Sequence, residues 1–76
     1  MRRAGTVVSV AQGVLVVRAA DSDPAGIGAP VVDDRWTRIG RIVDIFGPVG
    51  SPYLVVSMDD DVVSTDVLGE VLYIRD

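Results

Sequence analysis

β-Branched residues dominate the apolar part of this chain and restrict what it can fold into. Sixteen Val and five Ile stand against only four Leu. Branching at Cβ restricts a side chain in a helix but suits the pleated surface of a strand. The apolar runs are short, and clusters of Gly, Pro and Asp separate them. The sequence therefore predicts an all-β protein built from short strands.

The apolar runs predict six strands in one domain of residues 1–76. We expect these strands at residues 6–10, 14–19, 31–32, 37–46, 53–58 and 69–75. Gln12-Gly13 and residues 33–36 are typical of tight turns, and residues 64–68 of a turn or a single helical turn. Gly40 is expected to introduce a bulge or bend into the longest strand. Since an open sheet this small would expose unpaired edges, we predict a small six-stranded β-barrel, closed or partly open.

Both faces of several predicted strands are apolar. In residues 14–17, 53–56 and 71–74, alternate positions on both faces carry mainly Val, Leu, Ile or Tyr. One set of side chains is able to fill a barrel, and the other set must be covered. Packing beneath the long loop and the termini is one explanation. A protein-binding face is the explanation we favour.

The composition excludes several kinds of chemistry. The chain has no Cys and no His, which excludes disulfides, thiolate catalysis, zinc sites and a histidine acid or base. Residues 26–28 are typical of a flexible turn rather than a phosphate loop, and residues 59–61 of a solvated turn rather than a cation site. Asp44 is interpreted as a hydrogen-bond acceptor rather than a tuned acid. We expect no catalytic residue, no cofactor and no metal.

The charged residues are unusual in kind. All seven cations are Arg, ten of the eleven anions are Asp, and the formal net charge is −4. A small surface rich in Asp and empty of Lys favours a protein adapted to concentrated salt, where screening removes self-repulsion. A compositional bias of a small acidic protein from a GC-rich genome is the alternative.

The arginines argue against direct binding of nucleic acid. They are scattered along the chain, with acids between most of them. Arg35, Arg38 and Arg41 form the densest group, which is typical of a solvated strand face and less often of a small basic patch. No apolar run approaches the roughly 20 residues of a membrane helix, and the N-terminal residues do not look like a signal peptide. We therefore expect a soluble, cytoplasmic protein without a membrane or small-molecule partner.

The segment between the fourth and fifth predicted strands is a candidate partner-binding loop. Two prolines stiffen it, glycines permit its turns, and aromatic residues bracket it. A pre-ordered loop loses little entropy on docking, and aromatic residues are frequent interface anchors. A well-made hairpin corner explains the same residues. The candidate residues are Phe46, Gly47, Pro48, Val49, Ser51, Pro52 and Tyr53.

Residues 40–53, Gly-Arg-Ile-Val-Asp-Ile-Phe-Gly-Pro-Val-Gly-Ser-Pro-Tyr, resemble the core of the GAR/Naf family. The specific element is Asp-x-Phe-Gly-Pro-Val-x-x-Pro-Tyr. Residues 3–8, 28–33 and 69–75 are also similar to the family and follow in its order. Members of this family are small proteins of the H/ACA ribonucleoproteins, which guide pseudouridylation of RNA.

The resemblance implies a six-stranded barrel without catalysis of its own. It implies docking on the pseudouridine synthase subunit, away from the guide RNA, and help in loading and releasing substrate RNA through a mobile loop of that enzyme. RNA would then be contacted only through the complex. The glycine–arginine-rich tails of eukaryotic members are absent from this sequence, which resembles the archaeal form. Residues 32–44 also resemble the PRC-barrel, an interaction module of RNA-processing proteins, which is the alternative.

The acidic surface generates a prediction about stability in salt. Because salt screens repulsion between carboxylates, the melting temperature should rise steadily from low salt to molar KCl. Thermal unfolding followed by circular dichroism over a KCl series measures this effect. A melting temperature that stays flat over the series would contradict adaptation to salt and would leave the family resemblance untouched.

Overall fold

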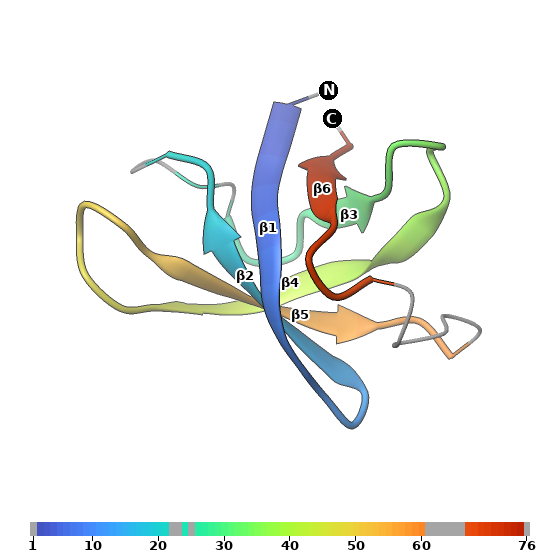
Figure 1. Ribbon diagram of the computed structural model, residues 1–76, viewed down its shortest axis with the longest axis horizontal. Helices are drawn as coiled ribbons and strands as arrows, with labels where there is room; N and C mark the ends of the chain where they lie inside the picture. Colours follow the sequence, from blue (N-terminus) through green and yellow to red (C-terminus); the bar gives the residue numbers. More distant parts are fainter. Residues whose placement is uncertain (1, 22–23, 25, 61–66, 76) are drawn as a thin grey trace.

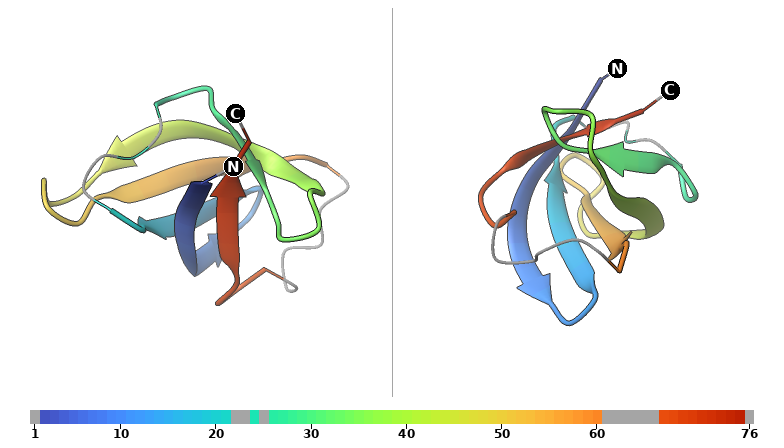
Figure 2. Two further views of the ribbon diagram at one scale, coloured as in Figure 1. Left: turned by 90° about the horizontal axis from the view of Figure 1, so that it is seen from above. Right: turned by 90° about the vertical axis from the view of Figure 1, so that its right-hand side faces the viewer.

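The computed structural model describes residues 2–21, 24, 26–60 and 67–75. It contains six strands, which pair antiparallel into a closed barrel in the order β1-β2-β5-β4-β3-β6. Figures 1 and 2 show the strongly bent strands curling around a common interior. The strands are β1 Arg2–Ala11, β2 Val14–Ala19, β3 Pro30–Val32, β4 Arg38–Phe46, β5 Tyr53–Met58 and β6 Val71–Ile74. The prediction of a six-stranded β-barrel is confirmed, and the barrel is closed.

The strands lie close to the predicted positions, and the differences have local causes. β1 begins at Arg2 rather than at residue 6 because its first residues pair with β6, Arg2 with Ile74 and Arg3 with Tyr73. β6 is shorter than expected because Gly69 turns the chain with φ +83° and its N–H donates to the carbonyl of Val7. Residues 67 and 68 form a turn as predicted, Gly69 belongs to this turn rather than to the last strand, and residues 64–66 lie outside the described residues.

Two short strands complete the ring. β3 has three residues and β6 has four, and β3 pairs with β4 on one side and with β6 on the other. Val31, in the middle of β3, faces Gly40 of β4 and Ile74 of β6. The edges that an open sheet would expose are therefore paired. Avoiding such unpaired edges was the reason for predicting a barrel.

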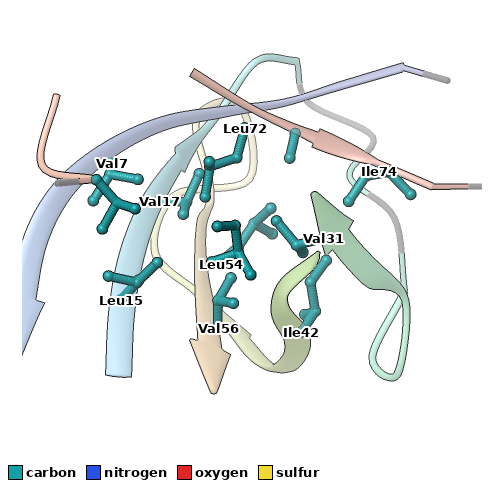
Figure 3. Packing of buried hydrophobic residues seen from close by; sticks show 12 residues of the cluster. Val7, Leu15, Val17, Val31, Ile42, Leu54, Val56, Leu72 and Ile74 are labelled. Atoms are coloured by element: carbon teal, nitrogen blue, oxygen red, sulfur yellow. The ribbon is translucent and has the colours of Figure 1, made fainter. Parts of the chain in front are cut away.

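The interior is filled by aliphatic side chains that alternate along the strands. Leu15, Val17, Leu54 and Val56 are at most 1% exposed, and Leu72 lies beside them (Figure 3). None of the described polar or charged side chains is buried. The core cluster comprises Ala4, Val7, Leu15, Val17, Val31, Ile39, Ile42, Leu54, Val56, Val67, Leu72 and Ile74.

Gly40 lies where β4 bends, as predicted. The register of β4 shifts on both sides of it, against β3 next to Gly40 and against β5 between Ile42 and Asp44. A Cβ at Gly40 would overlap the carbonyl oxygen of Ser57 and lie 2.8 Å from its carbonyl carbon. The backbones of β4 and β5 therefore approach too closely for any other residue, and the bulges on either side give the sheet its curl.

The close approach at Gly40 predicts a strong effect of a single methyl group. Gly40→Ala should destabilise the fold by about 3 kcal/mol or more, because the added Cβ meets backbone atoms that cannot move without breaking the β4–β5 pairing. Urea denaturation followed by circular dichroism measures the change. Gly50→Ala is the matched control, since a Cβ there meets nothing within 4 Å. This control should leave stability unchanged or raise it by about 0.5 kcal/mol, and an equal loss in both variants would contradict the argument.

Candidate docking surface

The loop between β4 and β5 is closed at its base by a pair of aromatic rings. Phe46 and Tyr53 are the last register partners of the two strands, and their rings stack at a centroid distance of 5.4 Å and an interplanar angle of 22°. Gly47 follows with φ +97°, and a Cβ there would lie 2.9 Å from Cδ2 of Tyr53. Gly47 therefore makes the aromatic pair possible, because it supplies the left-handed backbone and leaves room for the ring.

Backbone hydrogen bonds order the rest of the loop. The N–H of Ser51 donates to the carbonyl of Pro48 at 3.1 Å, and the N–H of Ala19 on β2 donates to the carbonyl of Pro52 at 3.0 Å. Pro52 is buried, so it anchors the loop to the barrel. Val49 stands at the tip and is 92% exposed. The loop therefore holds an aliphatic side chain out in solvent at the end of a fixed backbone.

A cation lies beside the aromatic pair. Arg18 of β2 is the register partner of Tyr53, and its guanidinium carbon is 5.9 Å from the centroid of the Tyr53 ring. This distance is within the range of a cation–π contact. Sequence analysis did not single out Arg18, because it is separated from Tyr53 by a long stretch of chain and only strand pairing brings them together.

The outer surface of the barrel continues the apolar character of the loop. Val16 and Val55 are register partners on the outer faces of β2 and β5, and both are half-buried. Val14 lies next to them, and the bulge in β4 leaves Val43 40% exposed. The docking surface is defined here as the loop 46–53 together with Val14, Val16, Val43 and Val55.

The seven residues predicted from the sequence are gathered in this one loop but differ in accessibility. Phe46 is 49% exposed, Tyr53 is half-buried and Pro52 is buried. The exposed loop residues are Gly47, Pro48, Val49 and Ser51. Phe46, Val49 and Tyr53 therefore carry the side chains available to a partner, while Pro52 and Gly47 shape the backbone.

The other positions weighed from the sequence have plain structural roles. The carboxylate of Asp44 is exposed and accepts a hydrogen bond from the N–H of Ile45 at 2.8 Å. The N–H of Ala29 donates to the carbonyl of Gly26 at 3.2 Å, which makes this segment a turn as predicted. In the part of the chain that the structure describes, no group of three acidic side chains is placed to hold a metal ion. No helix within that same part is long and apolar enough to cross a membrane.

The fold and this surface define a small closed β-barrel with an apolar face and a projecting loop, which is an architecture for binding other macromolecules. A family model described as the Gar1/Naf1 RNA binding region matches residues 1–76. The chain belongs to this family, as its resemblance to GAR/Naf proteins indicated. Members are accessory RNA-binding domains associated with H/ACA ribonucleoproteins, and the family is not a catalytic one.

Solved structures share the fold. The Gar1 domain of Naf1 matches with a TM-score of 0.75 over 97% of this chain and 85% of that chain, at 16% sequence identity. At so low an identity, the likeness establishes the barrel and not the residues of a site. Comparison with curated proteins finds no match. Of the two families that the sequence resembles, the family match supports GAR/Naf rather than the PRC-barrel.

Proposed function

We propose that this chain is a non-catalytic subunit of an H/ACA ribonucleoprotein that docks on the pseudouridine synthase and promotes loading and release of substrate RNA. The proposal rests on the family of the chain and, above all, on one observation. The aromatic–proline loop is fixed at both ends and presents Val49, 92% exposed, at its tip.

The geometry suits docking on a protein for two reasons. The loop is ordered before binding, so association costs little conformational entropy. Tyr53 and Val55 share the outer side of β5, and Val55 pairs with Val16, so the aromatic pair continues into aliphatic side chains that are bordered by Arg18 and Asp44. Interface cores are depleted of charge and enriched in aromatic residues. Burial against a partner would remove this area from water at about 25 cal/mol per Å².

The sharpest test places a charge at the tip of the loop. Val49→Asp should weaken association with the synthase subunit at least tenfold, which corresponds to about 1.4 kcal/mol. The reason is that a carboxylate buried against a partner without a counter-ion loses its hydration. Because the tip of the free barrel is solvated, stability should change by only about 0.5 kcal/mol. Isothermal titration calorimetry and thermal unfolding measure the two quantities.

Leu68→Asp is the matched control for this experiment. Leu68 is 60% exposed in the turn before β6, and Figure 1 places that turn on the other side of the barrel from the β4–β5 loop. The control adds the same charge and should bind the synthase as the parent does. If Val49→Asp folds and also binds like the parent, the loop is only a hairpin corner and the docking proposal is wrong.

A kinetic prediction follows from the absence of a catalytic role in this family. An accessory subunit that gates release of product changes the multiple-turnover rate and leaves single-turnover chemistry unchanged. Adding the parent protein to a synthase complex assembled without it should therefore raise only the multiple-turnover rate. Val49→Asp should lose this effect at concentrations near the parent's Kd. An equal effect on single-turnover chemistry would contradict a role in loading and release.

A further inference from the structure

Barrel closure gathers arginines that are far apart in the sequence. Arg3 of β1 pairs with Tyr73 of β6, Tyr73 pairs with Val32 of β3, and Val32 pairs with Arg38 of β4. Directly opposed residues in antiparallel strands point to the same side of the sheet. Ile74 and Val31, their neighbours along the chain, belong to the core, so this row lies on the outer side of the sheet, although Val32 within it is 0% exposed. Four strands therefore contribute to one outward row with an arginine at each end.

A second row lies beside the first. Pro30 pairs with Arg41, and the N–H of Arg75 donates to the carbonyl of Pro30 at 3.1 Å. Arg75 follows the inward Ile74 and so shares the outward side with Arg41. Figure 1 shows β3 and β6 side by side, with both ends of the chain at the same end of the barrel. The arginine face is defined as Arg3, Arg38, Arg41 and Arg75 with Tyr73.

Most of the positive charge of the arginine face is not neutralised. Arg38 pairs with Asp59, Nε to Oδ2 at 3.2 Å, and both side chains are partly exposed. Among the described residues, no carboxylate pairs with Arg3, Arg41 or Arg75, and all three are exposed. A local concentration of cations thus exists on a protein whose formal net charge is −4.

A tryptophan projects from the hairpin that forms part of this face. Trp36 is 54% exposed on the turn between β3 and β4 and has φ +66°, a conformation that bulky residues rarely adopt. Asp33 holds the turn, because its Oδ1 accepts from the N–H groups of Arg35 and Thr37, both at 2.9 Å. This carboxylate is thereby directed into the turn. The fold gains little from an exposed ring at a strained position, which points to a role in binding.

We propose that the arginine face, together with Trp36, is a contact surface for single-stranded RNA. Guanidinium groups bind phosphates, and an exposed indole offers a stacking platform for an unpaired base. Acidic protein segments would satisfy the arginines but not the tryptophan. The proposal goes beyond docking on the synthase, since β3 and β6 lie across the ring from β2 and β5, which carry most of the docking surface. A docked subunit would therefore keep Arg3, Tyr73 and Arg75 free, whereas Arg41 on β4 lies toward the docking surface because it pairs with Ser57, the register partner of Val14.

The acidic remainder of the protein limits the strength of this contact. Repulsion from the net charge makes binding by the isolated chain weak, without sequence preference and confined to low salt. Tethering through the synthase raises the effective concentration of the arginine face near RNA, so that a weak contact becomes significant within the complex. This proposal departs from the expectation that the chain meets RNA only indirectly, and it assigns the residues of a direct contact within the complex.

The test uses the isolated protein and a fluorescein-labelled oligouridine of about 12 nucleotides. Three unpaired arginines give a slope of about −2 in log K against log salt, so binding should weaken about 16-fold from about 50 mM to about 200 mM KCl. The double variant Arg41→Gln/Arg75→Gln keeps only Arg3 of these three arginines. Its binding should weaken only about threefold over the same change in KCl concentration. Fluorescence anisotropy measures the binding, and circular dichroism at each salt concentration checks that the barrel is folded.

A matched control separates local charge from total charge. Gln12→Glu/Arg18→Gln changes two residues away from the arginine face and, like the first variant, lowers the net charge by two, from −4 to −6. It should keep the salt dependence of the parent. If both variants lose this salt dependence equally, binding follows net charge and the proposed surface is wrong. The proposed surface is also wrong if neither variant changes the salt dependence.

The single tryptophan reports directly on stacking. Oligouridine should quench the fluorescence of Trp36, whereas inorganic polyphosphate, which has no bases, should bind the arginines without quenching. If an oligo-aspartate peptide binds more tightly than oligouridine and depends on Arg41 and Arg75, the face serves an acidic protein and the RNA proposal is overturned. If oligouridine binds without quenching the fluorescence of Trp36, the tryptophan is not part of the contact surface, and the proposal that Trp36 stacks on a base is wrong. Because these measurements use the isolated protein without the synthase, each of these results leaves docking on the synthase to be decided by Val49→Asp.

Discussion

Closure of the ring through β3 is the constraint on which the rest of this structure depends. Three residues of β3 pair on both sides, and without them β4 and β6 would be unpaired edges. So tight a ring demands strong curl, and the bulges around Gly40 supply it where β4 meets β5 without room for a side chain. Aliphatic side chains then fill the interior, and none of the described polar or charged side chains is buried there.

Closure also separates the outer surface into two regions of different chemistry. The outer faces of β2 and β5 carry Val14, Val16 and Val55 and continue into the aromatic pair of the β4–β5 loop. The other region lies around β6 and β3 and comprises Arg3 of β1, Tyr73 of β6, Arg38 and Arg41 of β4, and Arg75 directly after β6. The arginine region takes residues from both sides of the β3–β6 pairing, so it exists only in the closed barrel.

Much of the fold followed from local sequence signals. Alternating apolar runs predicted the strands. The adjacent aspartates predicted the turn at 33–36, and in the structure the side chain of Asp33 accepts the hydrogen bonds that stabilise this turn. The loop 46–53 was evident because Gly and Pro act on their own backbone. The start of β1 was placed less well because its first residues become strand by pairing with β6. The start of β6 was also misplaced, because Gly69 forms a turn rather than the first residue of the strand.

The sequence by itself determined the class of fold, the loop and its aromatic bracket, because these depend on intrinsic strand preference and on backbone conformation within a few residues. Only the tertiary structure decided which apolar face is interior, that Arg18 lies beside Tyr53, and that distant arginines share one face. The reason is geometric. Register between strands and the bulges that shift it set which side chains meet, and both arise from closing the whole ring rather than from any one segment.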